Sequence, residues 1–235
     1  MILGFDTATA GTAVALWAPG GPAVERRDDP APDERPTHAA RLLVLVEEVF
    51  AAAGASWDAV ERLAVGVGPG GFTGLRIGIA TARALAQART LPVVGVSSLE
   101  ALAAGATDEA GGRPVVAVID ARRAEVFTAA YPRGDSPPLA ARGDSPPLRA
   151  FGPVALAPAA LAARIEPGSL AVGDGAVRFR EELERAGAAI PADGSPLHRV
   201  SALQVCRLGA AGEPADRDAL LPDYRREPDA KPRIP

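Results

Sequence analysis

Short apolar runs separated by turn residues dominate the first hundred residues. Residues 2–5, 13–17 and 63–67 are typical of buried strands, and residues 93–96 form another short apolar run. A third strand is expected at residues 23–27, a more polar run between a turn and a polar, proline-rich loop. Two long segments with helical periodicity separate these runs. The alternation of strands and helices predicts an α/β fold with parallel strands.

The two helical segments carry an unusually broad apolar or small-residue surface. The first begins at the N-cap candidate Thr37 and runs to about Ala53, with Gly54 as its stop. The second runs over residues 74–89. A small residue recurs every four positions along it, at Gly74, Gly78, Ala82 and Ala86. We therefore expect these helices to pack closely against another backbone.

A second series of elements begins after residue 105. Residues 115–119 and 125–131 fit the two strands of a hairpin. Further elements are expected at 158–164, 170–172, 177–186 and 201–211. This restart predicts an N-terminal lobe at 1–104 and a C-terminal lobe at 105–235.

The C-terminal lobe contains a tandem repeat. The sequence from Arg133 to Leu139 recurs from Arg142 to Leu148, and both copies are rich in proline. We expect the segment 132–150 to be a flexible surface loop without a role in binding, because loops tolerate insertions. The polar end of the chain is expected to be extended.

Composition excludes several classes of function. The net charge is −4 and the pI about 5.3, so strong binding of nucleic acid by this chain alone is not expected. The single Cys206 excludes an internal disulfide and fits a reducing compartment. The first six residues lack the basic region of a signal peptide, and no apolar run is long enough to cross a bilayer. We expect a cytoplasmic protein.

Two segments near strand ends have the composition of phosphate-binding turns. Gly66–Gly71 matches the pattern G-x-G-x-x-G, but no acid ends the next strand and no Walker lysine is present, which disfavours dinucleotide and P-loop sites. Asp6–Thr7 follows the first strand. Asp6 is either an acid that holds a metal–phosphate complex or a turn residue that bonds its own backbone.

The residues needed for a metal site or a catalytic triad are scarce. His38 and His198 are the only histidines, and Leu42 stands where a second ligand on the His38 helix face would be needed. His38 is therefore expected at a helix end or on the surface, and Cys206 in the core. Asp120 and Glu125 are near enough for an acid pair, but neighbouring arginines favour salt bridges.

Five segments together resemble the bacterial TsaB (YeaZ) family: 2–9, 68–78, 95–102, 120–127 and 224–231. The glycine-rich second segment followed by Val-Ser-Ser-Leu-Glu is the most specific part. The resemblance covers most of residues 1–130 and the C-terminus. One departure is Gly71, where the family usually has Ser.

This resemblance implies an actin-like (ASKHA) fold of two lobes, each with a mixed sheet flanked by helices. It implies a non-catalytic scaffold or activating subunit that pairs with a TsaD-like catalytic subunit. That complex makes threonylcarbamoyladenosine on tRNAs that read ANN codons, and a TsaE-like ATPase joins it. The tRNA is reached only through the complex. The isolated chain is expected to form a homodimer, and no membrane is involved.

The resemblance also implies where the partner and a ligand bind. TsaD carries a metal through an H-x-x-x-H motif, of which only His38 is kept, so no metal is expected. No cofactor is required, although ATP or ADP with Mg²⁺ fits at or near the partner interface. Together with the helix pattern, the resemblance predicts a partner interface at Leu42, Leu45, Val46, Val49, Gly74, Gly78, Ile79, Ala82 and Arg83. The nucleotide-binding candidates are Asp6, Thr7, Gly70 and Gly71.

Three other functions compete with this hypothesis. A small-molecule kinase or ATPase of the same fold would use Asp6 on the metal–phosphate and would turn over nucleotide alone. A peptidase would need a metal or a nucleophile that these residues do not supply. A structural homodimer outside any larger complex would show no affinity for a TsaD-like protein.

Overall fold

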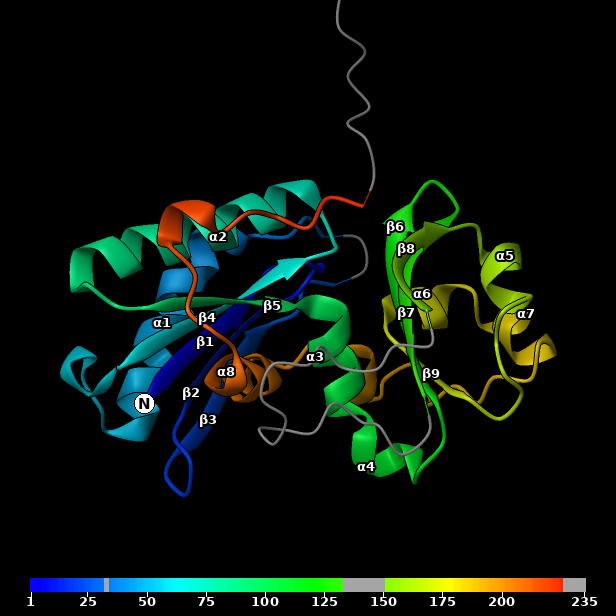
Figure 1. Ribbon diagram of the computed structural model, residues 1–235, viewed down its shortest axis with the longest axis horizontal. Helices are drawn as coiled ribbons and strands as arrows, with labels where there is room; N and C mark the ends of the chain where they lie inside the picture. Colours follow the sequence, from blue (N-terminus) through cyan, green and yellow to red (C-terminus); the bar gives the residue numbers. More distant parts are fainter. Residues whose placement is uncertain (32–33, 133–150, 226–235) are drawn as a thin grey trace, which may run out of the picture.

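The computed structural model describes residues 1–31, 34–132 and 151–225. Two lobes lie side by side, each built on its own sheet (Figure 1). The expected duplicated loop lies outside the described residues, apart from Pro132, as do the last ten positions of the tail. No helix of the described part has the length and apolar character needed to span a membrane.

The N-terminal lobe contains a five-stranded sheet in the order β3-β2-β1-β4-β5. β1 pairs antiparallel with β2, and β2 with β3, whereas β4 runs parallel to β1 and β5 parallel to β4. The strands are β1 (Ile2–Asp6), β2 (Thr12–Trp17), β3 (Ala23–Asp28), β4 (Arg62–Gly68) and β5 (Val93–Ser97). All five strands were expected, four from apolar runs and β3 from its place after a turn.

Helices cover both faces of this sheet. α1 (His38–Ala53) and α2 (Phe72–Arg89) pack on one face, and α8 (Ala202–Ala211) packs on the other (Figure 1). A short 3-10 helix, η1 (Trp57–Ala59), precedes β4. Gly54 ends α1 in the left-handed conformation, as its position after the periodic segment predicted.

The C-terminal lobe repeats this topology in shorter form. Its sheet has the order β8-β7-β6-β9, with antiparallel pairs β6–β7 and β7–β8 and with β9 parallel to β6. The strands are β6 (Val115–Arg122), β7 (Glu125–Tyr131), β8 (Phe151–Leu156) and β9 (Leu170–Val172). The order matches β3-β2-β1-β4 of the first lobe. The expected actin-like fold with two mixed sheets is confirmed.

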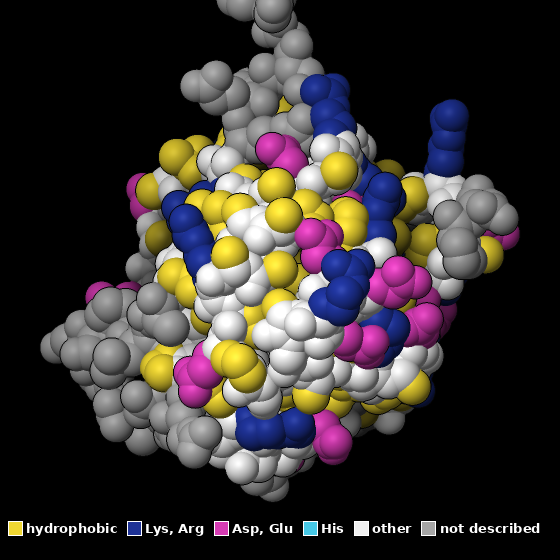
Figure 2. Space-filling view, turned by 90° about the vertical axis from the view of Figure 1, so that its right-hand side faces the viewer, with side chains coloured by type: hydrophobic (Ala, Val, Ile, Leu, Met, Phe, Trp, Pro, Cys, Tyr) yellow, Lys and Arg dark blue, Asp and Glu magenta, His cyan; other side chains and the backbone are white. Residues whose placement is uncertain are grey.

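The helices of the second lobe divide between its two faces. α3 (Ser98–Gly105) and α4 (Thr107–Ala110) follow β5, and α3 packs between the two sheets. The opposite face is covered by α5 (Pro158–Ala162), α6 (Asp174–Arg178) and α7 (Arg180–Arg185). Short 3-10 helices are η2 (Pro196–His198) and η3 (Arg217–Ala219). Figure 2 faces this end of the molecule and shows acidic and basic side chains interspersed.

Several local expectations differ from the structure. β8 and α4 were not expected. The helix expected at 177–186 is instead two short helices, α6 and α7, separated at Phe179. The N-cap of α3 is Ser97, whose Oγ accepts from the amide of Glu100 at 3.5 Å.

The glycines of the small-residue ridge of α2 pack against the end of β1. A Cβ at Gly74 would overlap the backbone carbonyl oxygen of Thr7, and a Cβ at Gly78 would overlap Thr7 Oγ1. Thr7 Oγ1 donates a hydrogen bond to the carbonyl oxygen of Gly74 at 2.8 Å. Only glycine at positions 74 and 78 leaves room for Thr7 to lie this close to α2.

Most side chains of the predicted partner interface lie in the lobe's own core, so the interface itself stays a prediction. The periodicity identified the apolar face correctly, but that face covers the sheet. The buried members are Leu42, Leu45, Val46, Val49, Gly74, Gly78, Ile79 and Ala82. The remaining member, Arg83, donates to the carbonyl oxygens of Asp218 and Leu220 at 3.0 and 2.7 Å.

The C-terminal part of the chain returns to the N-terminal lobe. α8 packs on the first sheet, Ala215 bridges to Val93 of β5, and Leu220 is buried in the first lobe's core. The strands before residue 105 form the first sheet and those after it form the second. α8 and the segment 212–225 follow the second sheet in the chain but pack on the first lobe.

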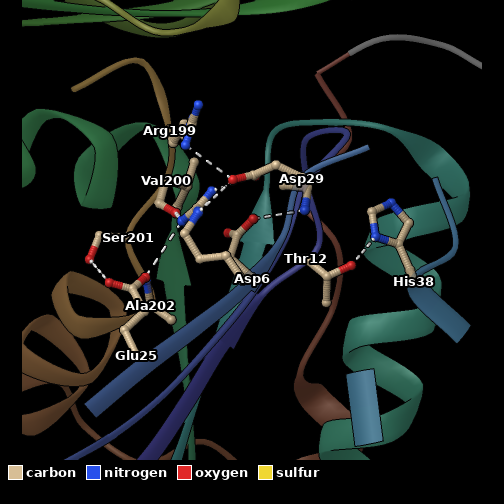
Figure 3. Close-up of polar contacts among 11 residues, drawn as sticks. Asp6, Thr12, Glu25, Asp29, His38, Arg199, Val200, Ser201 and Ala202 are labelled. Carbon is tan, nitrogen blue, oxygen red and sulfur yellow. Dashed lines mark hydrogen bonds and ion pairs between the residues drawn. The ribbon is translucent and has the colours of Figure 1, made fainter. Parts of the chain in front are cut away.

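Polar contacts hold α8 at both ends. Glu25 of β3 accepts from the amide of Ala202 at 2.7 Å and from Ser201 Oγ at 3.0 Å (Figure 3). Arg27 Nη1 donates to the carbonyl oxygen of Val200 at 2.7 Å. At the other end, Arg62 Nη1 donates to three carbonyl oxygens at 2.9–3.0 Å. Charged groups at these ends complement the unpaired groups of the helix.

The packing of α2 on β1 gives a test by single substitution. We expect Gly74→Ala to lower the free energy of unfolding by about 1–3 kcal/mol, although alanine favours a helix by about 1 kcal/mol. Gly105→Ala is the control, because a Cβ at Gly105 meets only an ordinary contact at 3.8 Å. Denaturant unfolding of both variants measures the difference. A Gly74→Ala variant as stable as the parent would contradict this packing.

Candidate functional site

A cleft of about 1100 Å³ opens between the two lobes. One wall is made by the β1–β2 turn and by the first turns of α1 and α2. The other wall is the β6–β7 turn together with Asp174, and residues 223–225 border the mouth. The cleft thus lies at the carboxyl ends of β1 and β4 and of β6 and β9, where α/β folds place ligands.

Asp6 does not line this cleft. Its side chain is buried, Oδ1 accepts from the amide of Ala8 at 2.8 Å, and Oδ2 accepts from Ser98 Oγ at 2.6 Å. Burial raises the pKa of the Asp6 carboxyl, and the hydrogen bond from Ser98 opposes that shift. A Cβ at Gly66 would overlap this carboxylate. Of the two interpretations of Asp6, the structure supports the turn residue.

The other nucleotide-binding candidates do line the cleft. Thr7, Gly70 and Gly71 all border it, and the amide of Gly71 donates to the carbonyl oxygen of Ala8 at 2.7 Å. A Cβ at Gly70 would collide with Ala8, whereas one at Gly71 would lie 3.6 Å from Ala8 O. The serine usual in the family at position 71 would therefore be accommodated.

His38 is the first residue of α1 and lies buried at the floor of the cleft. Its Nδ1 forms a 2.8 Å hydrogen bond with Thr12 Oγ1 (Figure 3). Burial lowers the pKa of His38, and the charge of Asp28 opposes that shift, so the neutral ring is favoured. His38 is at the expected helix end but is buried rather than on the surface.

The opposite wall carries a cluster of charged groups. Asp120 accepts from Arg178 at 2.7 Å and pairs with Arg122 at 3.2 Å, as the neighbouring arginines predicted. The amide of Asp120 donates to Asp174 Oδ1 at 3.0 Å. Burial, reinforced by the charge of Asp120, raises the pKa of Asp174 to about 6. This raised pKa could not be predicted from the sequence, because Asp174 stands between two glycines in a typical turn.

The β6–β7 turn has an unusual backbone. Arg122, Arg123 and Ala124 have φ values of 63°, 53° and 56°, in the left-handed region. Two-residue hairpin turns of this kind usually contain Asn-Gly or Asp-Gly. Side chains there cost conformational energy, and such strain is typical of functional turns. The strained turn places Arg122 and Arg123 on the cleft.

An aromatic pair stands at the mouth of the cleft. Phe72 and Tyr224 stack with ring centroids 5.5 Å apart and are 50% and 46% exposed. The Arg76 guanidinium lies 3.8 Å from the Phe72 centroid, and its Nε donates to the Tyr224 hydroxyl at 3.0 Å. Sequence analysis missed this pair, since the two residues are far apart in the chain. The amide of Asp223, which donates to Val67 O at 2.8 Å, holds the segment in place.

The described residues bring together no group of three or more potential metal ligands from His, Cys, Asp and Glu. Cys206 is buried in the core as expected, and burial raises the pKa of its thiol.

A second exposed feature is the outward side of α1 and α2. Leu43 and Val44 are 52% and 40% exposed, which is high for large apolar side chains. The exposed residues of α2 include several alanines. We call the residues Leu43, Val44, Ala80 and Ala84 the outer face. Large apolar side chains that are exposed next to each other, as Leu43 and Val44 are, are typical of protein-binding surfaces.

Comparison with known proteins relates the chain to enzymes and proteins of one tRNA modification pathway. Residues 33–142 match the family model described as TsaD, tRNA N6-adenosine threonylcarbamoyltransferase. The Escherichia coli protein TsaB, named for tRNA threonylcarbamoyladenosine biosynthesis, is 42% identical over 57% of this chain. The matches to the E. coli and Haemophilus influenzae proteins span 56% and 51% of those proteins. The chain therefore matches about half the length of these curated relatives.

Two further similarities extend over nearly the whole chain. An uncharacterized protein of Mycobacterium tuberculosis is 33% identical over 98% of this chain and 94% of its own length. The solved structure of YeaZ from Pseudomonas aeruginosa is 31% identical, with a TM-score of 0.74, over 95% of this chain and 98% of that one. Another structure from that organism is described as similar to peptidase YeaZ. The motifs, the two-lobed fold and these similarities together show that the chain belongs to the TsaB (YeaZ) family.

Proposed function

We propose that this chain is a non-catalytic subunit that pairs with a TsaD-like catalytic subunit for threonylcarbamoylation of adenosine in tRNAs reading ANN codons. Membership of the TsaB family supports the pathway, since curated members are named for it. The match of residues 33–142 to the TsaD model indicates that the two subunits share a fold, which suits pairing between related lobes. We further propose a TsaE-like ATPase as an additional partner and the cytoplasm as the location.

The observation that carries the pairing proposal is the outer face. Its large apolar residues Leu43 and Val44 lie on α1, whose opposite side is buried in the core of the lobe. Because most of the side chains predicted as the interface are buried in the lobe's core, we propose that the outer face makes the contact. A TsaD-like subunit would cover it in the complex, and a second copy of this chain would cover it in the isolated homodimer.

The proposed pairing is tested by one charge on the outer face. We expect Val44→Asp to weaken association with the TsaD homologue of the same organism by at least about tenfold, because a buried unpaired carboxylate is costly. Light scattering of the mixed proteins measures complex formation, and thermal unfolding checks that the variant is folded.

Ala160→Asp, at an exposed helical position of α5, is the matched control and should pair like the parent. Unchanged association of Val44→Asp would contradict the assignment of the outer face. Failure of the parent chain to associate at all would contradict the function itself.

A specific observation supports the alternative of a small-molecule kinase or ATPase. Asp174 lies on the cleft and has a pKa raised to about 6, the property expected of a general base. The buried Asp6 argues against it, because its carboxylate is already bonded to Ser98 and Ala8. We expect the isolated chain to show no ATP hydrolysis above that of its Asp174→Asn variant. Hydrolysis lost on this substitution would favour the alternative.

The raised pKa of Asp174 also predicts how stability depends on pH. The folded state binds a proton between about pH 4 and pH 6 that the unfolded state releases, so stability falls as pH rises through this window. Asp174→Asn should reduce the change in the free energy of unfolding over this pH window by about 1–3 kcal/mol. The variant should therefore be more stable than the parent at pH 7. Denaturant unfolding at several pH values measures it. Parallel profiles for parent and variant would contradict the shift.

A further inference from the structure

The segment that follows α8 crosses the first lobe as an extended strap. It runs from the end of α8 along α2 to the mouth of the cleft (Figure 1). We call residues 214–224 the strap. Leu220 is buried at 4% exposure, whereas residues 214–219 are exposed and Leu221 is 67% exposed. The strap is therefore attached through one buried side chain.

The backbone of the strap pairs with the open edge of the first sheet. β5 is the last strand of that sheet, and the amide of Ala215 donates to the carbonyl oxygen of Val93 at 3.0 Å. The amide of Asp223 donates to Val67 O at 2.8 Å. A register shift leaves Val67 without a partner residue on β5. The strap thus covers a strand edge, the kind of surface to which extended peptides add.

The side chain of Leu220 has a defined place on β5. It belongs to the apolar core of the first lobe, together with Val93. A Cβ at Gly95 would lie 3.0 Å from Leu220 Cδ1 and 2.9 Å from Val67 Cγ1, so glycine leaves room for the leucine. The space suits one branched apolar side chain.

Arg83 holds the strap by its main chain. Its Nη2 donates to the carbonyl oxygens of Asp218 and Leu220 at 3.0 and 2.7 Å. Hydrogen bonds from a guanidinium are stronger than those between neutral groups. Every peptide has backbone carbonyls, so this contact selects an extended main chain rather than particular side chains. We call Val67, Arg83, Val93 and Gly95 the strap site.

The strap shows what its site accepts, which is an extended main chain with one leucine-like side chain. A segment with a single buried side chain opens locally more easily than the core of a lobe. We propose that the strap is displaceable, and that the strap site binds an extended, leucine-bearing segment of a partner protein in its place. Displacement also removes Tyr224 from Phe72 and opens the mouth of the cleft on that side.

Release of the strap is tested by one charge at its buried position. We expect Leu220→Asp to release the strap, because a buried unpaired carboxylate is costly. Leu221→Asp, the same change at the exposed neighbour, is the matched control. Hydrogen exchange read by mass spectrometry should show the Ala215 and Asp223 amides exchanging at least about fivefold faster in Leu220→Asp. Their exchange in Leu221→Asp should match the parent.

A second variant tests release without a new charge in the core. Arg83→Ala should also speed the exchange of the strap amides, by about threefold or more. Arg89→Ala is the control on the same helix, because the Arg89 guanidinium lies over the Trp57 ring and not on the strap. Circular dichroism checks that each variant is folded.

Binding is tested with a synthetic peptide of residues 214–224 and the full chain alone, so the result does not depend on pairing through the outer face. Fluorescence anisotropy should show at least about tenfold tighter binding to Leu220→Asp than to the parent or Leu221→Asp. In those two chains the tethered strap competes at an effective concentration of about 1 mM. Adding Arg83→Ala to Leu220→Asp should weaken binding about fivefold. A peptide that itself carries Leu220→Asp should not bind.

Three results would overturn the proposal. Strap exchange that neither Leu220→Asp nor Arg83→Ala changes would show that the strap is not displaceable. Release of the strap without binding of the peptide would make it a structural segment only. Equal peptide affinity for the parent, Leu220→Asp and Leu221→Asp would place the binding site elsewhere on the molecule.

Discussion

The close approach of α2 to the end of β1 is the contact on which the rest of the structure depends. Gly74 and Gly78 allow Thr7 to lie directly against the helix, and the Thr7 hydroxyl bonds the Gly74 carbonyl. This contact fixes the apolar side of α2 toward the sheet. It also brings the first turn of α2 beside the β1–β2 turn and His38, which forms one wall of the cleft.

Two surfaces remain available once that contact is made. The outer face carries Leu43 and Val44, which suit a protein partner, and the cleft carries polar and aromatic groups, which suit a small ligand. They lie on different sides of the same two helices. Pairing and ligand binding can therefore be separated experimentally, and each has its own set of residues.

The sequence predicted the strands and long helices well, because their periodicity depends on residues close in the chain. A small-residue ridge has the same pattern whether it meets a sheet or a partner, so the pattern alone could not show that Gly74 and Gly78 lie against Thr7. Asp174 and the Phe72–Tyr224 pair were missed, because distant segments produce their environments. The return of α8 to the first sheet depends on Glu25 and Arg62, which no local pattern identifies.

Thiol labelling measures the orientation of α1 in the complex most directly. Cys206 is buried and the pKa of its thiol is raised, so a cysteine placed by substitution would dominate the reaction. Val44→Cys on the outer face should react readily in the isolated chain at low concentration and be protected by the TsaD homologue. Val49→Cys, on the core side, should be unreactive in both states. Equal reactivity of Val44→Cys with and without saturating partner would contradict the account.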